Sequence, residues 1–214
     1  MNLPNALTVA RIALTPPVAL LPFVDTATAR AAAFIIFVVA GLTDYFDGRL
    51  ARSRRDETDL GKILDPLADK LLLVGTFVPM YLLARWEFPF LTPWGRVGLP
   101  TWVIIVVLGR EAFMALFRQA AARRGVVIGA IGPAKWKTGM QLVWQGSAYF
   151  WFFAATLAAG RGWDDAAPWR AFANFNGIVG VVTMAAAVVM TLYSLWLYLR
   201  SYGGLLRRLA AGRR

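Results

Sequence analysis

The sequence predicts an all-α, polytopic membrane protein with six transmembrane helices and a short amphipathic surface helix at its N-terminus. Of the 214 residues, 58% are apolar and only 16% are charged, and the mean hydropathy is +0.55. A soluble domain of this length needs more polar surface to cover its core. Apolar stretches long enough to cross a bilayer, about 20 residues each, also recur between short polar breaks.

Six candidate transmembrane helices lie at residues 10–24, 30–51, 61–84, 98–122, 137–159 and 172–200. Prolines in the first stretch predict a kinked or tilted helix. These prolines are also atypical of a cleaved signal peptide. Ahead of this stretch, residues 1–11 favour a surface helix whose apolar side carries Leu3, Leu7 and Ala10. We expect one membrane domain over residues 1–200 and a basic cytoplasmic tail over 201–214.

The basic residues are distributed unevenly along the chain, which has a net charge of +11. If both termini lie on one side of the membrane, most of the 23 Lys and Arg residues fall on that side. The positive-inside rule then places both termini in the cytoplasm. The loops of the other side carry tryptophans typical of an interfacial belt, namely Trp86, Trp94, Trp163 and Trp169. A nucleic-acid partner is not expected, because that would require a soluble basic face.

The chain contains no cysteine and no histidine. This composition excludes disulfides, thiolate and imidazole nucleophiles, and zinc sites built from Cys or His. Acid–base or metal chemistry must therefore use Asp, Glu, Lys, Arg or Tyr side chains.

Four aspartates lie near the facing ends of the second and third predicted spans. Asp44 and Asp47 are three residues apart, and Asp65 and Asp69 are four apart, so each pair shares a helix face. A charge at the centre of a lipid-facing helix costs about 2.5–3.5 kcal/mol. The two helices are joined by a short polar stretch and must run antiparallel, which lets the four carboxylates converge near the cytoplasmic surface. Hard oxygen ligands in this number predict Mg²⁺ or Mn²⁺, with room for two ions.

Small residues accompany the aspartates. Gly48, Ala51 and Gly61 would let a flat group approach closely, and Arg52 could bind a phosphate. The alternative is an ordinary polar loop whose acids pair with neighbouring arginines. Three further acids of this stretch fit that alternative, namely Asp56, Glu57 and Asp59.

The pattern Asp44-x2-Asp47-Gly48-x2-Ala51-Arg52-x8-Gly61-x3-Asp65-x3-Asp69 resembles the CDP-alcohol phosphatidyltransferase motif at every fixed position. The resemblance implies a six-helix membrane enzyme, usually dimeric, whose metal site opens to the cytoplasm. It implies that Asp44, Asp47 and Asp65 bind metal, and that Asp69 is the general base and also lies near the metal. The implied CDP-binding residues are Asn5, Thr8, Gly48, Ala51, Arg52 and Gly61.

Three further stretches are similar to the bacterial phosphatidylglycerophosphate synthase subfamily: Asn2-Leu3-Pro4-Asn5-x2-Thr8-x2-Arg11, Gly109-Arg110-Glu111 and Lys135-x-Lys137-Thr138. This resemblance implies phosphatidyl transfer from CDP-diacylglycerol to sn-glycerol 3-phosphate, by a homodimer among the lipids of the bacterial inner membrane. The same chemistry with phosphatidylglycerol, serine or inositol phosphate as acceptor stays open. A divalent-cation transporter is a more distant alternative. Transport sites lie near the midplane of the membrane, whereas these aspartates are predicted to lie near one surface.

Four basic residues near the cytoplasmic ends of the fourth and fifth spans are candidate ligands for an acceptor phosphate, namely Arg110, Arg118, Lys135 and Lys137. Ordinary positive-inside charge is the alternative for each of them. For Arg110, a structural ion pair with Glu111 is a further alternative. Lys135 and Lys137 are two residues apart and cannot share a helix face, so we expect at most one of them to bind substrate.

Overall fold

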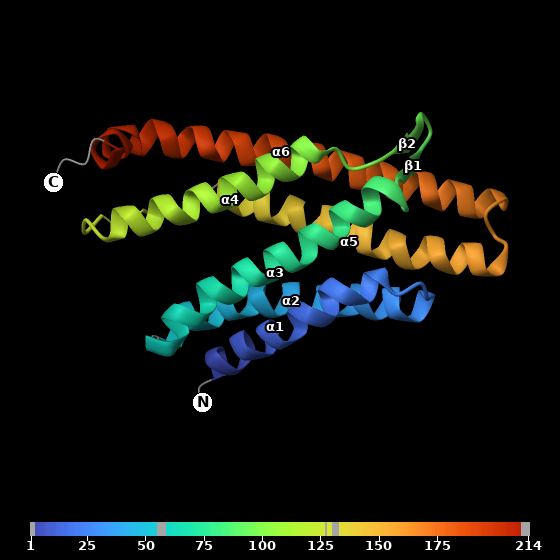
Figure 1. Ribbon diagram of the computed structural model, residues 1–214, viewed down its shortest axis with the longest axis horizontal. Coiled ribbons are helices and arrows are strands. Elements are labelled where there is room, and N and C mark those ends of the chain that lie inside the picture. The colour runs from blue at the N-terminus through green and yellow to red at the C-terminus, as the bar shows by residue number, and fades with distance from the viewer. Residues whose placement is uncertain (1–2, 55–58, 127, 130–132, 211–214) are drawn as a thin grey trace. The chain divides into compact units, whose positions relative to one another are not determined.

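The structure, a computed structural model, describes residues 3–54, 59–126, 128–129 and 133–210. Its main elements are six α-helices: α1 (Leu3–Leu20), α2 (Ala27–Arg54), α3 (Asp59–Trp86), α4 (Thr101–Ala122), α5 (Pro133–Arg161) and α6 (Ala167–Ala210). A 3₁₀ helix, η1 (Leu21–Phe23), follows α1. An antiparallel hairpin of β1 (Phe90–Thr92) and β2 (Gly95–Val97) connects α3 to α4 (Figure 1). The predicted helical class is confirmed, whereas this hairpin was not predicted.

Two helices contain segments that are long and apolar enough to cross a bilayer. These are Leu67–Trp86 in α3 and Ala167–Gly204 in α6, with mean hydropathies of 1.6 and 2.1. Shorter apolar helical segments occupy Thr8–Phe23 and Ala27–Thr43. Length and composition thus support two membrane spans within the described residues, and the full set of six stays a prediction.

The N-terminal region differs from the prediction. We expected a short surface helix followed by a separate first span, but α1 is continuous from Leu3 to Leu20. The side chains of Thr8, Arg11, Thr15 and Val18 are buried. Their spacing of three and four residues places them on one helix face, and α1 packs against both α2 and α3. This face of α1 is therefore packed inside the protein. It carries three polar side chains, which is why the pattern of apolar residues did not predict its burial.

The C-terminal helix also differs from its predicted length. The helix α6 continues past the predicted span of 172–200 to Ala210, so most of the predicted basic tail is helical. At 1.5 Å per residue, its 44 residues extend about 66 Å. The hydrocarbon core of a bilayer is only about 30 Å thick. A spanning α6 would therefore project well beyond that core.

The chain divides into two compact units. The first comprises Met1–Leu99 with Gln145–Gly180, and the second comprises Pro100–Trp144 with Val181–Arg214. The first unit thus contains α1, α2, α3 and the hairpin, together with the later part of α5 and the first part of α6. The second contains α4 and the remaining parts of α5 and α6.

A buried polar network joins α1, α3 and α5 inside the first unit. The hydroxyl of Tyr149 is directed at the main-chain oxygens of Thr76, at 3.1 Å, and Val18, at 3.4 Å. The side-chain amide of Gln145 donates to the Thr76 hydroxyl at 2.9 Å. The Tyr149 ring stacks on Phe37 with centroids 5.2 Å apart. These contacts satisfy polar groups that would otherwise be costly to bury.

The hairpin packs against the first part of α6, where two glycines make room for it. A Cβ at Gly177 would overlap the main-chain oxygen of Leu91, and one at Gly180 would lie 2.5 Å from the Phe90 ring. The indole nitrogen of Trp151 on α5 donates to the Pro89 oxygen at 3.2 Å, just ahead of β1. The hairpin is therefore fixed by a hydrogen bond from Trp151 of α5, and the two glycines of α6 allow it to pack closely against that helix.

Candidate active site

The four motif aspartates lie on two consecutive helices. Asp44 and Asp47 fall in α2, and Asp65 and Asp69 fall in α3. The helical backbone confirms that each pair shares a helix face. The side chains of Asp44, Asp47 and Asp65 lie outside the described part of the structure, so their convergence stays a prediction.

For most residues of the predicted CDP site, the structure likewise describes the backbone but not the side chain. Their backbone positions are helical, but their side chains lie outside the described part; they are Asn5, Gly48, Ala51, Arg52 and Gly61. Thr8 is described, and its side chain is 2% exposed. It lies three residues before Arg11 on the buried face of α1. Residues 56 and 57 of the polar connection lie outside the described residues altogether.

Asp69 is held by an arginine from another helix. The Arg11 guanidinium donates through Nη1 to Oδ1 of Asp69 at 2.9 Å, which ties α1 to α3. The Arg11 side chain is 4% exposed, whereas that of Asp69 is 61% exposed. A charge-assisted bond from a buried donor restricts the orientation of the carboxylate. The arrangement therefore presents Asp69 at the surface of the first unit in a defined orientation.

Carboxylate oxygens are suitable ligands for a hard divalent cation. Among the described side chains, no group of three or more acids gathers into a metal site. Of the four predicted ligands, only Asp69 has a described side chain, and its exposure and ionic partner are compatible with a ligand role. The donor set predicted from the sequence thus fits Mg²⁺ or Mn²⁺ by its chemistry.

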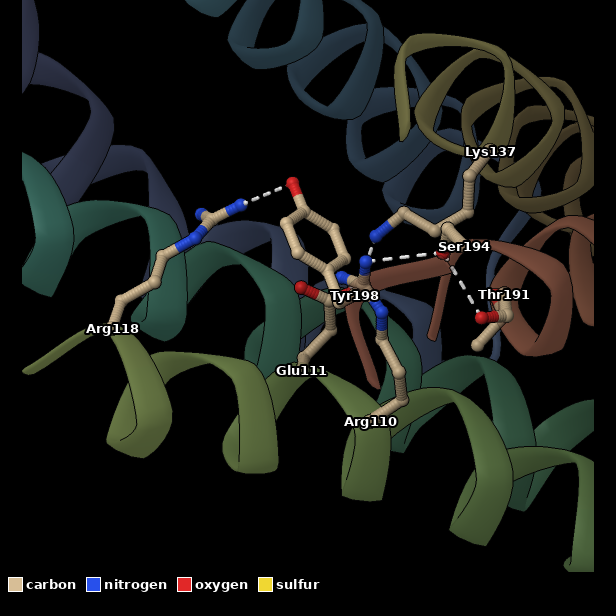
Figure 2. Close-up of polar contacts among 7 residues, drawn as sticks. All are labelled: Arg110, Glu111, Arg118, Lys137, Thr191, Ser194 and Tyr198. Atoms are coloured by element: carbon tan, nitrogen blue, oxygen red, sulfur yellow. Dashed lines mark hydrogen bonds and ion pairs between the residues drawn. The ribbon is translucent and has the colours of Figure 1, made fainter. Parts of the chain in front are cut away.

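A second polar cluster lies inside the second unit (Figure 2). Arg110 on α4 donates to Glu111 Oε1 at 3.1 Å and to the Ser194 hydroxyl of α6 at 3.1 Å. Lys137 of α5 forms an ion pair with the same Glu111 oxygen. Arg110 and Lys137 are 7% and 5% exposed, respectively. The ion pair that we considered as an alternative for Arg110 is therefore present, and it includes Lys137 as well.

Tyr198 of α6 lies beside the same cluster (Figure 2). Arg118, which is exposed, donates through Nη2 to the Tyr198 hydroxyl at 3.1 Å. That hydroxyl in turn donates to the main-chain oxygen of Gly129 at 3.2 Å. Tyr198 is fully buried. The guanidinium carbons of Arg110 and Arg118 lie 5.8 and 5.7 Å from the centre of its ring.

Three of the four residues predicted for an acceptor phosphate are therefore brought together. Arg110 and Lys137 contact Glu111, and Arg110 and Arg118 lie beside the ring of Tyr198. The side chain of Lys135 lies outside the described part. Three cations beside one carboxylate leave a net positive charge, which suits an anion such as a phosphate. The sequence identified these cations and Glu111 as a possible partner of Arg110, but it did not identify Ser194 and Tyr198 as further partners.

Comparison with known proteins identifies the family. Residues 1–199 match the CDP-alcohol phosphatidyltransferase family model. The chain therefore belongs to this family, and the enzyme class predicted from the aspartate motif is confirmed. The family generally uses divalent metals. Family membership and the two long apolar helices together make the chain a membrane protein.

Three relatives indicate which branch of the family the chain resembles. It is 34% identical over 154 residues to CDP-diacylglycerol–glycerol-3-phosphate 3-phosphatidyltransferase 2 of Arabidopsis thaliana. It is 36% identical over 141 residues to the enzyme of that name from Rickettsia bellii, and 34% identical over 154 residues to that of Bacillus subtilis. The matched segments cover 67%, 66% and 66% of this chain. They span 62% of the Arabidopsis protein, 71% of the Rickettsia protein and 73% of the Bacillus protein.

Proposed function

We propose that the chain transfers the phosphatidyl group of CDP-diacylglycerol to sn-glycerol 3-phosphate, giving phosphatidylglycerophosphate and CMP. The observation that carries the choice of acceptor is the clustering of Arg110, Arg118 and Lys137. A phosphate monoester bears close to two negative charges at neutral pH, and its binding requires nearby cations. The names of the similar enzymes from Arabidopsis, Rickettsia and Bacillus support the same acceptor.

The donor would bind at the aspartate motif. Asp44, Asp47, Asp65 and Asp69 would hold Mg²⁺ or Mn²⁺, two ions in our proposal, and bound ions would offset the charge of the pyrophosphate and of departing CMP. The small residues of the motif leave space for the cytidine, and polar side chains bind the rest of the CDP group. The residues assigned to this site are Asn5, Thr8, Gly48, Ala51, Arg52 and Gly61.

The chemical step is an in-line displacement at one phosphorus. A glycerol 3-phosphate hydroxyl oxygen forms a bond to the phosphorus that carries diacylglycerol, and the bond from that phosphorus to the CMP oxygen breaks. Asp69 accepts the proton of the attacking hydroxyl, and Arg11 keeps the carboxylate oriented to receive it. CMP departs with the electron pair of the broken bond.

The cellular setting follows from charge. The side of the membrane that holds both termini receives most of the basic residues. This bias favours an active site that faces the cytoplasm. The resemblance to bacterial synthases implies the bacterial inner membrane. We also propose a homodimer, as the family resemblance implies.

An acceptor panel tests the proposal. Purified protein would receive CDP-diacylglycerol with sn-glycerol 3-phosphate, phosphatidylglycerol, serine or inositol phosphate, and CMP release would be measured. We expect the fastest release with glycerol 3-phosphate, its loss in EDTA, and its recovery on addition of Mg²⁺ or Mn²⁺. Preference for another acceptor would overturn the acceptor assignment while leaving family membership intact.

A further inference from the structure

Tyr198 connects the basic cluster to the rest of the second unit. Its ring lies within about 6 Å of both guanidinium groups, the range in which a cation is attracted to an aromatic face. Arg110 and Arg118 are eight residues apart on α4, about two helical turns, and therefore lie on the same face. The side chain of Tyr198 thus lies beside both arginines in Figure 2.

The direction of the hydrogen bonds defines what the hydroxyl does. Because Tyr198 donates its proton to the Gly129 main-chain oxygen, the hydroxyl oxygen is left as an acceptor for Arg118. These two hydrogen bonds link Tyr198 of α6 to Gly129, in the connection that follows α4, and to the Arg118 guanidinium. Arg118 is therefore oriented by a fully buried residue, although its own side chain is exposed.

The basic residues of the cluster differ in whether their hydrogen-bond partner offsets their positive charge. Arg110 and Lys137 share the carboxylate of Glu111, which offsets part of their positive charge. Arg118 bonds to a neutral hydroxyl, which leaves its charge intact. A guanidinium has further N–H donors beyond the one that Tyr198 receives. Arg118 is thus accessible, and the hydroxyl to which it bonds does not offset its positive charge, which suits the binding of a phosphate dianion.

We propose that Tyr198 is a positioning residue for the acceptor: by orienting Arg118, it determines the affinity of the enzyme for the phosphate of glycerol 3-phosphate. This inference rests on the proposed function. It adds a residue that does not touch the reacting atoms and acts through Arg118.

The test is Tyr198→Phe, which removes the hydroxyl and keeps the ring. We expect the KM for glycerol 3-phosphate to rise about 10-fold, the scale of a lost hydrogen bond to a charged group. We expect kcat and the KM for CDP-diacylglycerol to stay within about twofold of wild type, because the donor site is untouched. Inhibition by inorganic phosphate, which competes with glycerol 3-phosphate, should weaken by a similar factor.

Tyr149→Phe is the matched control. Tyr149 is 1% exposed, and its hydroxyl is also directed at main-chain oxygens, but it belongs to the buried network of the first unit. The control should lower thermal stability without changing the KM for glycerol 3-phosphate. Arg118→Gln, at an exposed side chain, should raise that KM at least as much as Tyr198→Phe does. Adding Tyr198→Phe to Arg118→Gln should then raise it by less than about twofold, since both changes remove the same interaction.

Unchanged KM for glycerol 3-phosphate in Tyr198→Phe or in Arg118→Gln would overturn the role of Tyr198 and leave the proposed function standing. Equal rises in both KM values, or a similar rise in Tyr149→Phe, would show a general structural effect and would also overturn it. If wild-type enzyme does not use glycerol 3-phosphate at all, the proposed function fails together with this inference.

Discussion

The buried Arg11 contacts Asp69, the one aspartate of the motif whose side chain the structure describes. Arg11 is almost fully buried, and it forms an ion pair with Asp69, the residue that we assign as the general base. Removing one member of such a pair leaves the other with an altered environment and a less defined orientation. The residue therefore links the packing of α1 to the chemistry at α3.

Arg11→Met tests this link, because methionine keeps much of the apolar stem and removes the charge. We expect kcat for CMP release to fall by at least about 10-fold, since misplacing a catalytic group can cost up to 10²-fold. Arg11→Lys should be intermediate, because it retains the charge and loses the planar donor geometry. Wild-type kcat in Arg11→Met would show that Asp69 needs no support from α1.

The four aspartates themselves are tested by replacement with asparagine, which keeps the shape and removes the charge. Each of Asp44→Asn, Asp47→Asn, Asp65→Asn and Asp69→Asn should lower kcat/KM by at least about 10²-fold, the scale of losing one charge-stabilising group. Asp56→Asn, in the polar connection, is the control and should be nearly silent. Two of the four variants with near-normal turnover would be incompatible with a shared metal site.

Some residues of the candidate site could be identified from the sequence, and others could not. The aspartates stood out as candidates because like charges in an apolar sequence are costly, and their convergence stays a prediction. The basic residues were candidates because of their positions near the cytoplasmic ends of two predicted spans and because of the family resemblance. Arg11 and Tyr198 were missed as supporting residues because their roles depend on partners 58 and 80 residues away in the sequence. Two signals were available for Arg11: its position as a lone charge within an apolar stretch, and its place at the end of the N-terminal motif.

At the scale of elements, the hairpin between α3 and α4 depends on glycines in α6. Gly177→Ala would place a Cβ against the Leu91 main-chain oxygen, so the hairpin or the helix must shift. We expect a loss of about 1–3 kcal/mol in unfolding free energy, typical of overpacking, and a lower melting temperature in detergent. The thermal denaturation of purified protein measures this directly.

Gly203→Ala is the control for that substitution. It lies on the same helix, and a Cβ there would meet no atom within 4 Å. Alanine is favoured over glycine inside a helix by about 0.5–1 kcal/mol, so stability should be unchanged or slightly higher. Equal destabilisation by the two substitutions would contradict the docking role of Gly177.

The helices were predictable from apolar runs, whereas their ends and packing were not. Hydropathy identifies residues that avoid water, but it does not distinguish lipid from the protein interior. For this reason Thr8 and Arg11, which lie on the buried face of α1, were predicted to lie in a surface helix. The hairpin was missed because its strands, Phe90–Thr92 and Gly95–Val97, are too short for an alternating pattern to emerge.

At the scale of the whole molecule, the orientation in the membrane can be tested with single cysteines, since the chain has none of its own. Ala166 and Ser201 are both exposed and lie at the two ends of the predicted final span. With cytoplasmic termini, Ala166→Cys should react with an impermeant thiol reagent in intact cells. Ser201→Cys should react only after permeabilisation, and the reverse pattern would place the active site on the opposite side.

The transfer itself is the most direct test of the central claim. CDP-diacylglycerol labelled at the phosphorus attached to diacylglycerol would be incubated with purified enzyme, divalent metal and sn-glycerol 3-phosphate. We predict that the label appears in phosphatidylglycerophosphate, in an amount equal to the CMP released, and that no label appears in CMP. Label that appears in phosphatidate at the same rate with or without glycerol 3-phosphate would mean hydrolysis of the donor and would contradict phosphatidyl transfer to this acceptor.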